Sequence, residues 1–268
     1  MAASLTEESG DGTLSLDDLG SCWVMAVLGL LAVVGGVMSY VVAVFGFHWF
    51  TYRTWVFDLV VAGGALIAAL GWYSGGPGWA AFSAVAIGVM WFVVSRVELR
   101  LKGSARLALS TGSELPTLRL RTVDNVIVTH EDLKRQAPVL LVLYRGWWCP
   151  SSKVQLDELL DEYESFAAAG LTVYAASVDS PEQAAAMQAH VGDHITILCD
   201  MPASLLDDIG ARDTRGAPWY DRLLFGAAKR DIAMPTSLVV DKDGRILTAH
   251  RASRVDDRPH RRDWLQRL

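Results

Sequence analysis

The residue best suited to covalent chemistry in this sequence is Cys149, within the run Arg-Gly-Trp-Trp-Cys-Pro-Ser-Ser-Lys at positions 145–153. A cysteine thiolate is a nucleophile that attacks peroxides and disulfides. Pro150 stands where proline is favoured as the first residue of a helix, so we expect Cys149 at a helix N-terminus. The unpaired N–H groups and the positive end of the helix dipole favour the thiolate there, and Arg145 and Lys153 add positive charge.

A second thiol is missing at the spacing that a disulfide cycle uses, because Ser152 stands three residues after Cys149. We expect the Ser152 hydroxyl to donate a hydrogen bond to the sulfur, but it cannot attack a mixed disulfide. Cys199 is the candidate resolving thiol. An edge strand would place it several strand spacings of about 4.8 Å from the centre of the sheet, whereas a disulfide needs Cα atoms within about 7 Å. A buried structural role for Cys199 is the alternative.

No cofactor and no metal site are expected. The six histidines show no metal-ligand spacing, and no glycine-rich loop matches a phosphate-binding fingerprint.

Strand and helix patterns alternate around Cys149. An apolar run of buried-strand length at 139–144 precedes it, and an amphipathic stretch follows it. The other predicted elements are strands at 171–178 and 195–199, helices at 182–190, 202–209 and 258–268, and hairpins at 117–128 and 236–248. This order predicts an α/β domain with a mixed sheet. Right-handed crossovers then place Cys149 at the edge where the parallel strands end.

From about residue 115 to 268 the sequence resembles the thioredoxin-like fold in its peroxiredoxin-like branch (alkyl hydroperoxide reductase/thiol-specific antioxidant, or redoxin). The motifs that carry the likeness are LP at 115–116, the strand at 139–144, YRGWWCP at 144–150, SVDSP at 177–181, LCD at 198–200 and PTSLVVDKDGRI at 235–246. The resemblance implies reduction of a peroxide, or exchange with a protein or small-molecule disulfide. It also implies an external reductant, either a thioredoxin-like protein or a low-molecular-weight thiol.

Two positions depart from the family pattern. Typical members carry Thr or Ser three residues before the reactive cysteine and Arg ahead of the late strand, where this chain has Gly146 and Pro235. Pro235 resembles instead the cis-proline of thioredoxins, which lies beside the active-site cysteine and shapes the substrate groove. We therefore assign Cys149, Arg145, Ser152 and Pro235 to catalysis, and Trp147, Trp148, Pro150 and Thr236 to the substrate groove.

The N-terminal part has a different composition. Of the 77 residues between Asp18 and Arg96, only Arg53 and Asp58 are charged. Apolar runs at about 23–47, 55–73 and 79–95 are near the ~20 residues that cross a bilayer, so we predict three transmembrane helices. This pattern excludes a purely soluble protein, and three cysteines exclude a disulfide framework. The net charge of −6 gives no basic excess for nucleic acid.

These observations give a plan for the whole chain. It has a flexible acidic leader at 1–21, a membrane anchor of three helices at 22–95, a basic linker at 96–113 and the peroxiredoxin-like domain at 114–268. Three spans with the N-terminus outside place all the nearby positive residues, and hence the redox domain, on the cytoplasmic side of a multi-pass membrane protein. Two spans are the alternative, since the second run is short if Asp58 marks its start.

Two functions stay open. The chain is either a membrane-anchored thiol oxidoreductase with a single reactive cysteine, or a degenerate redoxin-fold scaffold that docks a partner at the lipid bilayer. The first function requires that a substrate can reach the Cys149 sulfur and that other groups do not already occupy the helix amides around it.

Overall fold

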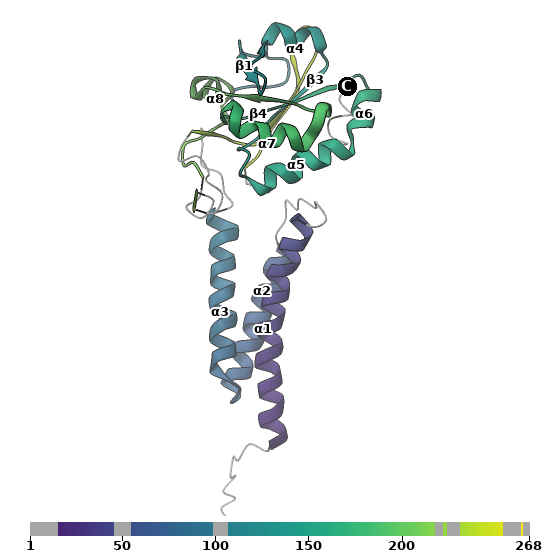
Figure 1. Ribbon diagram of the computed structural model, residues 1–268. Helices are drawn as coiled ribbons and strands as arrows, with labels where there is room; N and C mark the ends of the chain where they lie inside the picture. The colour runs from purple at the N-terminus through teal and green to yellow at the C-terminus, as the bar shows by residue number, and fades with distance from the viewer. Residues whose placement is uncertain are drawn as a thin grey trace, which may run out of the picture. The chain divides into compact units, whose positions relative to one another are not determined.

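The computed structural model describes residues 16–45, 55–98, 107–217, 222–223, 231–253 and 264. These residues belong to two compact units (Figure 1). The first contains most of the three N-terminal helices, and the second contains Val41–Tyr52 and the chain from Val94 onward. Most of the acidic leader, the connector at 48–54 and the centre of the basic linker lie outside the described residues. The expected closing helix at 258–268 also lies outside them, apart from Trp264.

The N-terminal unit contains three long apolar helices, as predicted. They are α1 (Leu16–Phe45), α2 (Trp55–Tyr73) and α3 (Gly78–Val93), and a short π-helix, Val94–Glu98, continues α3. Three segments are long and apolar enough to cross a membrane: Gly20–Ala43, Trp55–Tyr73 and Gly78–Arg96, the last of which includes the start of the π-helix. Helix α1 begins at Leu16, inside the segment that the sequence assigns to the leader.

Small residues let these helices approach closely. A Cβ atom added to Gly29 would lie 2.4 Å from the backbone nitrogen of Ala68 and 2.6 Å from the carbonyl oxygen of Gly64. Between α2 and α3, the indole Nε1 of Trp91 donates to Asp58 Oδ1 at 2.9 Å. Asp58, which the sequence places near the start of its helix, is therefore held by a neighbouring helix.

The second unit is a seven-stranded mixed sheet in the order β2-β1-β5-β4-β3-β8-β9. The central strands β3, β4 and β5 are parallel, and antiparallel pairs β1–β2 and β8–β9 flank them. The strands are β1 (Arg119–Thr122), β2 (Ile127–Thr129), β3 (Val139–Leu143), β4 (Thr172–Ala176), β5 (Thr196–Cys199), β8 (Thr236–Val240) and β9 (Ile246–Arg251). Both predicted hairpins are confirmed. Strand β5 is an inner strand, because β1 pairs with its outer side.

Helices cover both faces of this sheet (Figure 1). They are α4 (His130–Gln136), α5 (Pro150–Asp161), α6 (Tyr163–Ala168), α7 (Pro181–Val191) and α8 (Ala203–Ile209), with a 3-10 turn at Gly192–His194. Leu133 of α4 and Leu206 of α8 pack on one face. Leu156 of α5, Phe166 of α6 and Met187 of α7 pack on the other, together with Trp264.

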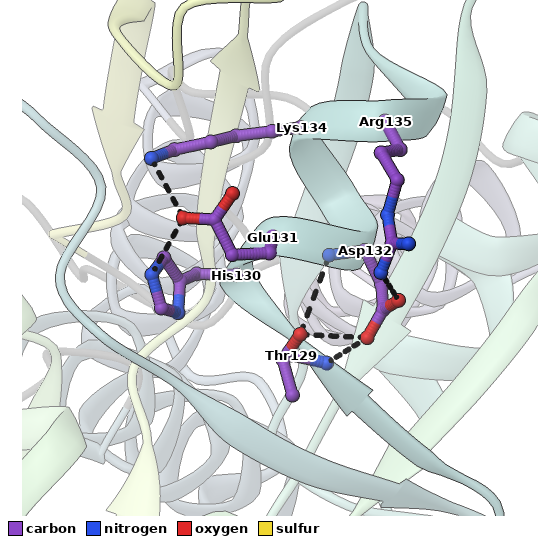
Figure 2. A network of polar contacts seen from close by, with 6 residues as sticks. All are labelled: Thr129, His130, Glu131, Asp132, Lys134 and Arg135. Atoms are coloured by element: carbon purple, nitrogen blue, oxygen red, sulfur yellow. Dashed lines mark hydrogen bonds and ion pairs between the residues drawn. The ribbon is translucent and has the colours of Figure 1, made fainter.

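A capping box starts α4 (Figure 2). The Thr129 hydroxyl accepts from the backbone N–H of Asp132 at 3.3 Å, and Asp132 Oδ2 accepts from the backbone N–H of Thr129 at 2.9 Å. These bonds satisfy amides that the first helical turn leaves unpaired. Helix α4 thus starts directly after β2, and its Leu133 is buried against the sheet.

A separate two-stranded ribbon, which the sequence analysis did not predict, joins β6 (Arg212–Asp213) to β7 (Ile232–Ala233). In its register Asp213 is opposite Ile232. Strands of two residues carry no periodic pattern, so only the folded chain reveals this ribbon.

Candidate active site

Cys149 lies at the N-terminal end of α5, six residues after β3 ends at Leu143. It is the N-cap residue, and its side chain makes no capping hydrogen bond. Its backbone N–H donates to Gly146 O at 3.1 Å, and its carbonyl accepts from the N–H groups of Ser152 at 3.0 Å and Lys153 at 3.2 Å. The predicted strand, turn and helix around Cys149 are confirmed, with Pro150 as the first helical residue.

The surroundings of Cys149 differ from the expectation of an accessible sulfur. Cys149 is 2% exposed and packs in a cluster with Trp148, Ala217 and Ile232, which we call the Trp148 cluster. Trp147 and Val178 pack against its margin. Ile232 comes from the β6–β7 ribbon, so an element that was not predicted from the sequence helps to bury Cys149.

Arg145 is buried beside the same cluster instead of flanking the turn in solvent. It is 1% exposed, and its Cζ lies 5.2 Å from the centre of the Trp148 ring. Its Nη2 lies 3.6 Å from Oδ2 of Asp213, which is fully buried. Burial raises the pKa of the Asp213 carboxyl, and the nearby Arg145 charge lowers it in part.

Ser152 is fully buried, and its Oγ accepts from the backbone N–H of Arg145 at 3.3 Å. The expected hydrogen bond from Ser152 to the sulfur is not found among the described residues. Through this hydrogen bond, Ser152 instead links the first turn of α5 to the backbone of Arg145.

A second buried carboxylate, Asp179, holds the turn before Cys149. Its Oδ2 accepts from the backbone N–H of Trp147 at 2.8 Å and from Ser177 Oγ at 2.9 Å. Burial raises the pKa of Asp179, and these two hydrogen bonds lower it in part. Gly146, in the same turn, has a φ of 149°, and a Cβ there would lie 2.5 Å from Trp148 Nε1. The close approach of Trp148 therefore explains why glycine stands at this position.

Pro235 and Thr236 lie beside the end of β3, because Thr236 pairs with Leu143 in the β3–β8 ladder. The expected cis-proline is wrong: among the described residues the cis bond is Ala137–Pro138, and Met234–Pro235 is trans. The carbonyl of Pro235 accepts from Ala252 N–H at 2.8 Å. Thr236 is buried and its hydroxyl donates to Met234 O at 2.9 Å, so it does not face a groove.

Cys199 is not brought together with Cys149. It ends β5, two strands from β3, and its sulfur donates to Arg121 O at 3.1 Å. Burial raises the pKa of this thiol to about 11. Cys199 belongs to the core under α5–α7, whereas Cys149 belongs to the Trp148 cluster, and both thiols are free.

Asp179 and Asp213 are not among the site residues predicted from the sequence. Asp179 could have been predicted from the sequence, because it lies in the motif at 177–181 that carries the family likeness. Asp213 has no local signal, and only the burial of Arg145 reveals that a carboxylate is needed beside it. In the described part of the chain, no group of three or more His, Cys, Asp or Glu residues is arranged to hold a metal ion.

Among solved structures, the chain resembles reduced Prx3 in complex with H2O2 from Vibrio vulnificus, with 18% identity and a TM-score of 0.50 over 59% of this chain and 97% of that one. It also resembles a cysteine-to-serine variant of Peroxiredoxin 6 of Arenicola marina, with 13% identity and a TM-score of 0.50 over 59% of this chain and 70% of that one. At these identities the likeness shows the shared fold alone.

Peroxidoxin BcpB from Mycobacterium tuberculosis is similar at 19% identity and a TM-score of 0.46, over 55% of this chain and 90% of that one. No curated protein sequence matches the chain significantly.

The sequence matches the model of the AhpC/TSA family over residues 111–249, which is more than half of the chain. This segment contains the whole strand–turn–helix around Cys149 and six of the seven strands of the main sheet, together with the first part of β9. The fold and the sequence match thus agree on one assignment: the chain belongs to the AhpC/TSA family.

Proposed function

We propose that this protein is a membrane-anchored thiol peroxidase that uses Cys149 as its single reactive cysteine and an external thiol as reductant. The observation that carries the proposal is the place of Cys149, at the N-cap of α5 directly after the turn that follows β3, in a domain of the AhpC/TSA family. The N–H groups of Ser152 and Lys153 donate to the Cys149 carbonyl and not to its sulfur, so the support from the helix is the positive end of its dipole.

The chemistry is a two-electron transfer. The Cys149 thiolate attacks one oxygen of a hydroperoxide, so that an S–O bond forms as the O–O bond breaks. The sulfur is oxidised to a sulfenic acid, and the departing alkoxide or hydroxide takes up a proton and leaves as alcohol or water. Since Cys149 is 2% exposed, the side chains of the Trp148 cluster must move apart before a peroxide reaches the sulfur.

An external thiol then returns Cys149 to its reduced form. One thiol condenses with the sulfenic acid, which releases water and leaves a mixed disulfide on Cys149. A second thiol attacks that disulfide and frees the Cys149 thiolate. Ser152, which has no sulfur, cannot replace this second thiol, and Cys199 is held by Arg121 in a different part of the core. The reductant is therefore a thioredoxin-like protein or a low-molecular-weight thiol.

Disulfide exchange is the second activity that the redoxin fold suggests. The sequence feature that favoured it was the likeness of Pro235 to a cis-proline, and the trans bond at Met234–Pro235 removes that support. Peroxide reduction is therefore the reaction we propose.

The burial of Cys149 supports one rival, a redoxin-fold scaffold without catalysis. The test is consumption of hydrogen peroxide and of an organic hydroperoxide by the purified full chain in detergent with dithiothreitol. Cys149→Ser is expected to abolish consumption, because serine does not form the nucleophile. Cys22→Ser, the matched change in α1, is expected to leave it unchanged. A Cys149→Ser variant as active as the native chain, or a native chain without activity, would favour the scaffold.

For the membrane part, we propose the orientation that the charges favour. The leader carries five acidic residues and no basic ones up to Ser21, whereas Arg96, Arg100 and Lys102 follow the third apolar helix. Positive residues near spans prefer the cytoplasmic side. This puts the leader outside, the anchor at 22–95 in the bilayer, and the linker and redox domain at the cytoplasmic face.

A further inference from the structure

Polar atoms without hydrogen bonds gather beside Cys149. In the described part of the chain, these buried atoms are Nε and Nη2 of Arg145, Oδ2 of Asp213, Nε1 of Trp147 and Nε1 of Trp148. Buried polar groups in folded proteins are nearly always paired, since leaving one unpaired costs about 1–3 kcal/mol. Several of them at and beside the Trp148 cluster, which contains Cys149, indicate a place built to bind further polar atoms.

The Arg145–Asp213 pair leaves the guanidinium with unused donors. The distance of 3.6 Å between Nη2 and Oδ2 is longer than a normal hydrogen bond, so the pair neutralises charge without consuming the N–H groups. The other oxygen, Asp213 Oδ1, accepts from the backbone N–H of Arg215 at 3.0 Å. That bond fixes the carboxylate with Oδ2 directed at Arg145.

The β6–β7 ribbon connects Asp213 to the Trp148 cluster. Asp213 is paired in register with Ile232, and Ile232 packs with Cys149 and Trp148. On its outer side, Arg212 binds Asp231 at 2.8 Å and Asp207 at 2.6 Å. The ribbon is thus held by exposed ion pairs on one side and inserts a single buried carboxylate on the other.

Resting on the peroxidase function proposed above, we propose that Asp213 is a positioning residue that holds Arg145 beside Cys149, so that Arg145 Nε and Nη2 bind the departing oxygen of the hydroperoxide. As the O–O bond breaks, negative charge develops on that oxygen, and the guanidinium stabilises it in a site closed to water. Without Asp213, the buried cation would be uncompensated and would turn toward solvent or lose its order.

The test compares two reactions of Cys149 in the full chain in detergent: oxidation by cumene hydroperoxide, followed by mass spectrometry of the trapped sulfenic acid, and alkylation by iodoacetamide. Iodoacetamide contains no departing oxygen, so its rate reports only access and thiolate content. Asp213→Asn is expected to slow oxidation about tenfold or more while alkylation changes by less than about threefold. Asp231→Asn, the matched change in the exposed pair of the same ribbon, is expected to leave both rates unchanged.

A second variant covers the case in which Asp213→Asn fails to fold. The double substitution Arg145→Met with Asp213→Leu replaces a buried ion pair by apolar side chains, which cores often tolerate. This variant is expected to fold, as judged by its tryptophan fluorescence, and to oxidise about a hundredfold more slowly at a retained alkylation rate.

Two outcomes overturn the inference: oxidation at the native rate in either variant, or loss of both reactions in equal proportion in both variants, which is a purely structural effect. The outcome for the proposed function is read separately. If the native chain itself shows no oxidation of Cys149, the peroxidase function fails; if it is oxidised and the Asp213 variants match it, only the role of Asp213 fails.

Discussion

At the scale of single residues, the thiol of Cys199 and the two buried carboxyl groups of this domain have different surroundings. Asp179 receives hydrogen bonds from Trp147 and Ser177 and so shapes the turn before Cys149. Asp213 faces the Arg145 guanidinium. The Cys199 sulfur donates to the carbonyl of Arg121 in the core. Residues of the same type in this domain therefore differ in role because they contact different partners in the folded chain.

Substitution of Cys199 tests this view. Cys199→Ala is expected to keep hydroperoxide consumption within about twofold of the native chain, because the buried thiol lies in a different cluster from Cys149. The measurement is the same consumption assay with dithiothreitol. A loss as large as that of Cys149→Ser would instead assign Cys199 the resolving role.

Cys199 also predicts a pH dependence of stability. Its pKa in the folded chain is about 11, raised from 9.0 by burial. As the pH rises from 9 toward 11, the unfolded chain releases this proton first, so it binds fewer protons than the folded chain. The free energy of unfolding contributed by this group then falls with rising pH. Urea unfolding of the native chain and of Cys199→Ala at pH 8 and 10.5 should show a smaller decline in the variant; equal declines would contradict the assignment.

At the scale of elements, the close contact of α1 with α2 depends on Gly29 in α1 and Gly64 in α2. A Cβ on Gly29 would overlap the backbone of α2, whereas one on Gly63 would meet nothing within 4 Å. We expect Gly29→Ala to lower the thermal midpoint of the full chain in detergent, because α1 must move away from α2. Gly63→Ala is the matched control, and alanine there is favoured over glycine in a helix by about 1 kcal/mol.

The readout is the loss of helical circular dichroism on heating, in one detergent for all three chains. A Gly29→Ala midpoint equal to that of the control would show that the two helices do not pack through this contact.

At the scale of the whole molecule, the charge distribution predicts the orientation in the membrane. In intact cells, a cysteine at Ser9 is expected to react with a membrane-impermeant maleimide, and one at Asp243 only after permeabilisation, in a background without Cys22. The reason is that basic residues flank only the predicted cytoplasmic ends of the spans. Labelling of both positions in intact cells would indicate two spans, and the reversed pattern would overturn the proposed orientation.

How much could be predicted from the sequence depends on the range of each signal. The three apolar helices, the parallel strands and the hairpins follow from local patterns of apolar residues, and Thr129 and Pro150 mark helix starts through their own side-chain chemistry. Errors occurred where the decisive contact is distant. The bond before Pro235 is trans, and the burial of Cys149 involves Ile232 of the β6–β7 ribbon.

The sequence by itself determined the membrane-like N-terminal helices, the order of the α/β elements and the cysteine at a helix N-terminus, because each is set by residues next to one another in the chain. Only the tertiary structure decided that Cys149 is buried, that Arg145 is paired with Asp213 and that Cys199 is held elsewhere. These features join residues far apart in the sequence, and neither hydrophobic periodicity nor charge composition records which of them meet in the folded chain.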